Sequence, residues 1–116
     1  MPFYLEPQFL IPASTGLIFV AAGYLSLKFP PKKINSVYGY RTPNSMKDQK
    51  RWEFAQKYAS KEMMKLGALL ALSCLSVFVF VASTVVGLVI AFSLMITVVL
   101  TLIVRTEKAI STKFGK

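Results

Sequence analysis

The sequence contains no histidine, one cysteine and five acidic residues among its 116 positions. Without histidine, the chain lacks the side chain that most often transfers protons near neutral pH. The single Cys74 cannot form an internal disulfide, and nothing in the sequence resembles the ligand spacing of a zinc site. We therefore expect Cys74 to be a small apolar residue of a helix. We predict no metal site and no bound cofactor.

The sequence also contains a long stretch without charge: no charged residue occurs from Leu66 to Val104. As a single helix this stretch would measure about 58 Å, whereas the hydrocarbon core of a bilayer is about 30 Å thick. Two spans joined by a tight turn near Ser83 and Thr84 fit better. A second apolar stretch precedes Pro30. We therefore predict an all-α integral membrane protein, one domain over residues 1–116, with transmembrane helices at about residues 9–29, 66–82 and 85–104.

The net charge of +9 is distributed in a way that suits a membrane protein better than a nucleic-acid-binding protein. No Lys or Arg precedes Phe9, and none lies near the turn at Ser83. A cleaved signal peptide is an alternative for residues 1–29, but such a peptide begins with a positive region that is missing here. We predict a multi-pass protein of the cell membrane with its N-terminus outside and residues 30–65 and the C-terminus in the cytoplasm. The basic residues that favour this orientation are Lys32, Lys33, Arg41, Lys47, Lys50, Arg51, Lys57, Lys61, Lys65, Arg105, Lys108, Lys113 and Lys116.

The segment between the first two predicted spans ends in a basic amphipathic helix, from about residue 46 to 65. Ser45 is expected to be its N-cap, with Asp48 three residues later as in a capping box. Lysines on the other side can contact anionic lipid headgroups or an acidic protein. The apolar face at helical spacing consists of Trp52, Ala55, Ala59, Met63 and Leu66.

An arginine within a glycine- and tyrosine-containing turn precedes this helix. The five donors of Arg41 suit a carboxylate or a phosphate. The alternative is a structural role, in which Arg41 pairs with Asp48, Glu53 or helix-end carbonyls. Gly39 permits a turn that other residues disfavour, and Asn35 is typical of turns.

Several residues of this segment resemble the signature of the SdpI family of bacterial membrane proteins. The founding member of that family protects a toxin-producing cell from its own secreted antimicrobial peptide and holds a transcriptional repressor at the membrane. The resemblance implies an immunity or signal-transduction protein whose partners are a toxin peptide or a cytoplasmic regulator. The residues that it implies for ligand or partner binding, or for organising the loop, are Lys33, Asn35, Gly39, Tyr40, Arg41, Thr42, Ser45 and Trp52.

Other functions remain open from the residues alone. Ala22 and Ser26 permit close helix packing, and Ser93, Thr97 and Thr101 share one helix face. These features are compatible with a homo-oligomer, a subunit of a membrane complex or a small oligomeric transporter. No ionisable residue lies deep in a predicted span, which disfavours a pump. Asp48 and Glu53 would lie about 140° apart on a helix, so we predict a binding protein and not an enzyme.

Overall fold

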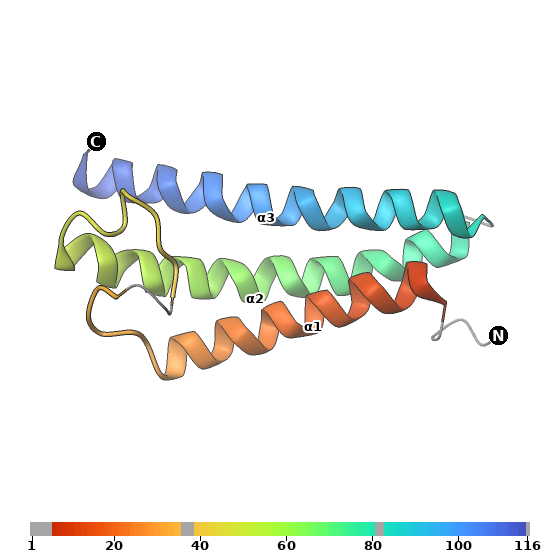
Figure 1. The fold of residues 1–116 in the computed structure, drawn as a ribbon, viewed down its shortest axis with the longest axis horizontal. Coiled ribbons are helices and arrows are strands. Elements are labelled where there is room, and N and C mark those ends of the chain that lie inside the picture. Colours follow the sequence, from red (N-terminus) through yellow and green to blue (C-terminus); the bar gives the residue numbers. More distant parts are fainter. Residues whose placement is uncertain (1–5, 36–38, 81–82, 116) are drawn as a thin grey trace.

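The computed structural model describes residues 6–35, 39–80 and 83–115, with the backbone alone for residues 74–80. Three helices follow one another: α1 (Pro7–Lys28), α2 (Gln49–Phe80) and α3 (Thr84–Phe114). They lie lengthwise side by side, and the bundle measures 50 × 26 × 20 Å. In Figure 1 α2 is seen between the other two, and α1 also contacts α3, since a Cβ on Gly87 would lie 2.9 Å from Gln8 Cβ. The described part of the chain has no strand. The prediction of an all-α fold is therefore confirmed.

Two helices in the described residues, α1 and α3, are long and apolar enough to cross a membrane. Their large apolar side chains point outward, as a lipid-facing surface requires: Val85 is 71% exposed, and Leu17 and Val104 are each 64% exposed. Because an α-helix forms its backbone hydrogen bonds within itself, such helices suit the hydrocarbon core of a membrane. The hydroxyls of Ser93 and Thr97 donate to the carbonyls four residues earlier, at 2.7 and 2.8 Å.

The predicted span at residues 66–82 corresponds to the second half of α2, which ends at Phe80. Residues 81 and 82 lie outside the described residues, as do the side chains of residues 74–80, Cys74 among them. That this half of α2 crosses the membrane stays a prediction, as does the cytoplasmic position of residues 30–65. α2 itself is continuous from the basic segment into the apolar one.

The start of α2 corrects one expectation. The helix begins at Gln49, and Asp48 caps it because its Oδ1 accepts the Arg51 N–H at 2.8 Å. Ser45 is not the N-cap because its hydroxyl is engaged within the preceding turn, where it accepts the Thr42 N–H at 2.9 Å. Thr42 Oγ1 in turn accepts the Ser45 N–H at 3.1 Å. The backbone N–H and the hydroxyl of Ser45 and Thr42 are thus hydrogen-bonded within the turn that precedes the helix.

Glycines let α1 and α2 approach closely. A Cβ placed on Gly16 would lie 2.5 Å from the Gly67 carbonyl oxygen, and a Cβ on Gly67 would lie 2.7 Å from that of Gly16. About two turns further along α1, a Cβ on Gly23 would lie 2.6 Å from the Ser60 carbonyl oxygen. Small residues allow such contacts in lipid. These contacts of α1 with α2 therefore require glycine, and close packing through Ala22 and Ser26 stays a prediction.

Replacing Gly16 by isoleucine should destabilise the bundle, because the new side chain meets the α2 backbone, which cannot rotate away. We expect a loss of about 1–3 kcal/mol, the usual cost of overpacking, measured by thermal unfolding in detergent with circular dichroism. The matched control is Ala21→Ile, since Ala21 is exposed on the same helix. Equal unfolding temperatures for the two variants would contradict this packing.

Candidate functional site

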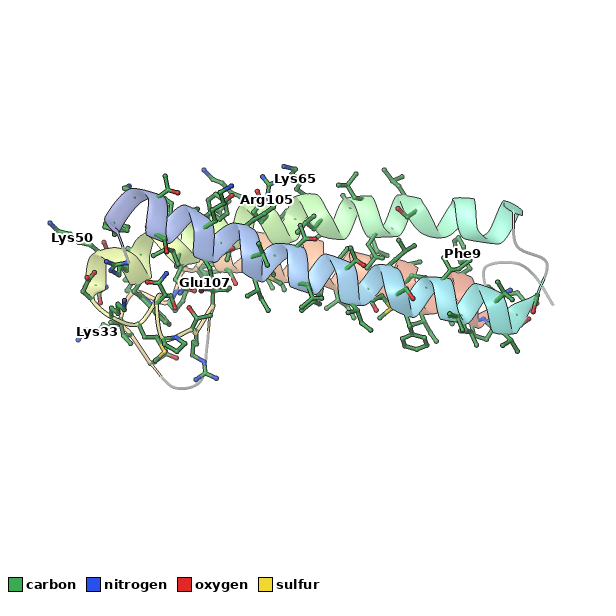
Figure 2. All side chains as sticks on the ribbon, turned by 90° about the horizontal axis from the view of Figure 1, so that it is seen from above. Phe9, Lys33, Lys50, Lys65, Arg105 and Glu107 are labelled. Atoms are coloured by element: carbon green, nitrogen blue, oxygen red, sulfur yellow. The ribbon has the colours of Figure 1, made fainter. Side chains whose placement is uncertain are left out.

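The candidate site is the polar end of the bundle, which consists of the loop of residues 29–48 (called the polar loop), the start of α2 up to Lys65 and the end of α3 from Arg105. In Figure 1 the loop crosses the ends of α2 and α3 that lie farthest from the start of α1. Figure 2 shows Lys33, Lys50, Lys65, Arg105 and Glu107 in this half of the molecule and Phe9 toward the opposite end. The polar end thus gathers charged groups beside the apolar part of the bundle.

Trp52 fixes the start of the loop. Its ring is fully buried, and its indole N–H donates to the Pro31 carbonyl at 2.6 Å. Ala55 and Ala59 on the same face are also buried, as the helical spacing predicted. Since a buried tryptophan needs a partner for its N–H, the contact with Pro31 satisfies the ring within its own chain. Trp52 is therefore not exposed for contact with another molecule.

Gln56, one turn after Trp52, binds the loop backbone twice. Its Oε1 accepts the Tyr40 N–H and its Nε2 donates to the Tyr40 carbonyl, both at 2.7 Å. The approach depends on Gly39, whose φ of 103° is unfavourable for other residues and where a Cβ would lie 2.6 Å from Gln56 Oε1. Sequence analysis did not identify Gln56, although a glutamine between buried positions of an apolar face was a usable signal.

Glu107 on α3 holds the same part of the loop from the other side. It accepts hydrogen bonds from the Tyr40 hydroxyl at 2.7 Å and from the Thr42 hydroxyl at 2.6 Å. Burial, and then the hydrogen bond to Glu107, raises the pKa of Tyr40 above its ordinary value, so the hydroxyl remains a donor. Nothing in the sequence indicated this contact, because more than sixty residues separate the partners.

The structural arginine of the polar end is Arg51 and not Arg41. Arg51 is 8% exposed and donates to the carbonyls of Phe114 and Gly115 at 3.1 and 2.8 Å. It also forms an ion pair with Asp48 at 3.4 Å. A guanidinium is favourable there because the C-terminus of a helix carries unpaired carbonyls and partial negative charge.

Arg41 is exposed, although both its neighbours face the bundle. No hydrogen bond or ion pair joins its side chain to any residue that the structure describes. Lys33 is also exposed, and its carbonyl accepts the Asn35 side-chain amide at 3.0 Å, as expected of a turn. The structure thus packs Gly39, Tyr40 and Thr42 of the loop against side chains of α2 and α3. Ser45 and Trp52 are buried, whereas Lys33 and Arg41 lie on the surface.

The carboxylates of the polar end are mostly engaged within the chain. On the side of the bundle away from the loop, Glu62 is buried and forms a two-point ion pair with Arg105, with N–O distances of 3.1 and 3.2 Å. Among residues 6–35, 39–80 and 83–115 there is no group of three or more Cys, Asp or Glu side chains that could hold a metal ion. The arrangement offers basic groups for binding an anion.

Comparison with known proteins identifies the family of this chain. The model of the SdpI/YfhL protein family matches residues 32–105. The chain belongs to the SdpI/YfhL family. It is similar to the uncharacterized protein YfhL of Bacillus subtilis (strain 168), with 48% identity over 56 residues, which cover 48% of this chain and 51% of YfhL. The chain thus aligns with about half the length of that relative, and no solved structure matches.

Family membership and the two apolar helices identify a membrane protein, and the resemblance found in the sequence is confirmed. The matched region contains residues 32–48 of the polar loop, together with Arg51 and Gln56 of α2. Glu107 lies just beyond it. The loop and the α2 side chains that hold it therefore belong to the family segment of SdpI/YfhL proteins.

Replacing Gln56 by methionine should loosen the loop, because the Tyr40 N–H loses its partner and the Tyr40 carbonyl keeps only the longer hydrogen bond from Ser45 Oγ, at 3.3 Å, while the side chain keeps a similar volume. An unsatisfied buried polar group costs about 1–3 kcal/mol, so we expect a loss of roughly 1–3 kcal/mol of unfolding free energy and faster proteolysis within residues 30–48. Lys57→Met is the matched control, since Lys57 is exposed on the next position. If both variants unfold and are cleaved alike, Gln56 does not anchor the loop.

Proposed function

We propose that this SdpI/YfhL protein is a membrane-embedded binding protein of the immunity and signal-transduction type. The apolar helices, including the second half of α2 as a third span, meet a secreted antimicrobial peptide at or within the membrane. The polar end lies in the cytoplasm and binds an acidic segment of a regulator. The N-terminus lies outside.

One observation carries the proposal: Arg41 is exposed on a loop whose neighbouring residues are fixed. Tyr40 and Thr42 are held by Glu107 at 2.7 and 2.6 Å, and the Tyr40 backbone is held by Gln56. A loop that is ordered before binding loses less conformational entropy when a partner arrives. Arg41 is therefore presented in a defined position for hydrogen bonds to a carboxylate.

The charge balance of the polar end supports an anionic partner. Asp48 is paired with Arg51, and Glu62 with Arg105. Glu107 is occupied by the loop hydroxyls. Most of the basic side chains, in contrast, are exposed, among them Lys33, Arg41, Lys47 and Lys50. A surface of this kind attracts acidic segments and repels basic ones.

The test is survival of a sensitive bacterium that expresses the protein and is exposed to a panel of secreted, membrane-active peptides. We expect at least one peptide against which the protein raises survival. Arg41 is tested separately, because it binds the regulator and not the toxin peptide: binding of a synthetic acidic peptide to the purified protein should fall roughly 10–100-fold in Arg41→Gln, since a hydrogen bond to a charged group contributes about 1.5–3 kcal/mol. Lys47→Gln makes the same charge change at another exposed loop position and should retain this binding.

Membrane insertion of each variant is checked by fractionation. If the inserted wild-type protein protects against none of the peptides, the immunity function is wrong. If Lys47→Gln weakens binding of the acidic peptide as much as Arg41→Gln does, overall charge and not Arg41 is responsible.

A further inference from the structure

We propose that the face of the bundle opposite the polar loop contains a site for one anionic phospholipid, with its phosphate between α2 and α3 and an acyl chain along α3. This inference rests on the membrane placement of the protein but not on its role in immunity. In Figure 2 Arg105 and Glu107 lie on opposite sides of α3, with Glu107 toward the loop. The lipid site is therefore separate from the surface around Arg41.

The headgroup part of the site is a groove of about 570 Å³ between the ends of α2 and α3 (called the basic groove). Among the described residues, no Asp or Glu lines the basic groove. Phe54 and Tyr58 form its α2 wall, and its α3 wall supplies three cations and a hydroxyl, those of Arg105, Lys108, Lys113 and Thr112. Basic pockets of this kind between helices on the cytoplasmic side suit the phosphate of a lipid.

Two of the three cations, Arg105 and Lys113, are positioned before a lipid arrives. Glu62 holds the Arg105 guanidinium at two points, at 3.1 and 3.2 Å, which fixes its orientation. The Lys113 ammonium lies 4.7 Å from the centre of the Phe54 ring. Because Glu62 neutralises Arg105, the net attraction for a phosphate comes from Lys108 and Lys113. Arg105 contributes its remaining, directed N–H donors.

The acyl-chain part is a second groove of about 280 Å³ along α3, lined by Thr97, Leu100, Thr101, Val104 and Arg105 (called the apolar groove). Arg105 lines both grooves, so the two meet at the residue where the apolar run of α3 ends. The Thr97 hydroxyl donates to the Ser93 carbonyl, which leaves its methyl group for apolar contact. Together the two grooves accept a molecule with an anionic head and an apolar chain.

This geometry distinguishes a phospholipid from other anions. An acidic peptide or free phosphate could occupy the basic groove, but neither would fill the apolar one. Along α3, Lys113 lies about 12 Å beyond Arg105, so the basic groove begins at the edge of the hydrocarbon and extends through the headgroup layer. The phosphate of a lipid lies in that layer.

Native mass spectrometry of the purified full chain in detergent tests the site with phosphatidylglycerol, phosphatidylcholine and glycerol phosphate as probes. We expect phosphatidylglycerol to bind at least tenfold more tightly than phosphatidylcholine. Lys108→Gln with Lys113→Gln should weaken it about 25-fold, since each basic residue near an anionic lipid contributes about fivefold. Glycerol phosphate, the headgroup without chains, should bind at least tenfold more weakly than the whole lipid.

The matched control is Lys32→Gln with Lys33→Gln, which removes the same charge from exposed positions of the loop and should change phosphatidylglycerol binding by less than twofold. Circular dichroism confirms that both double variants are folded. Equal binding of the two lipids, equal losses in the two double variants, or equally tight binding of glycerol phosphate would each overturn the proposal. Since the survival experiment does not depend on these residues, such a failure would leave the proposed immunity function standing.

Discussion

The constraint on which this structure depends is that lipid offers no hydrogen bonds to a backbone. Apolar segments in a bilayer must therefore form helices that satisfy their own N–H and C=O groups, and charged groups must leave the hydrocarbon. In this protein the apolar helices carry exposed Leu, Ile and Val, and glycines bring α1 and α2 into contact at Gly16 and Gly67. Recognition by charged groups is consequently confined to the polar end.

At that end the chain faces the opposite requirement, because the described residues of the polar loop (29–35 and 39–48) form neither helix nor strand. Side chains from two helices hold the loop: Gln56 binds the Tyr40 backbone, Trp52 binds the Pro31 carbonyl, and Glu107 binds two loop hydroxyls. Most of the residues that the resemblance singled out in the sequence therefore organise the loop, and the exposed Arg41 is the candidate for a partner. The arginine with the structural role is Arg51, which donates hydrogen bonds to the carbonyls at the C-terminal end of α3.

Physical chemistry explains which features were predictable. The apolar runs gave the helices of the bundle because length and hydropathy decide them locally, and the buried face from Trp52 to Leu66 followed from helical spacing. The N-cap was misplaced because Ser45 pairs with Thr42, a contact within the loop that competes with capping. The roles of Arg41 and Arg51 could not be assigned, since both have the same chemistry and only the position of the α3 end distinguishes them. The contact between Tyr40 and Glu107 depends on the folded bundle and has no local signal.

The central claim is that the polar end lies in the cytoplasm, and labelling of single cysteines tests it most directly. In a Cys74→Ala background, Lys47→Cys reports on the polar loop and Thr84→Cys on the start of α3 at the opposite end; both positions are exposed. With a membrane-impermeant maleimide on intact cells, the account predicts that Thr84→Cys is labelled, whereas Lys47→Cys is labelled only after the membrane is opened. Labelling of Lys47→Cys in intact cells as fast as that of Thr84→Cys would contradict it.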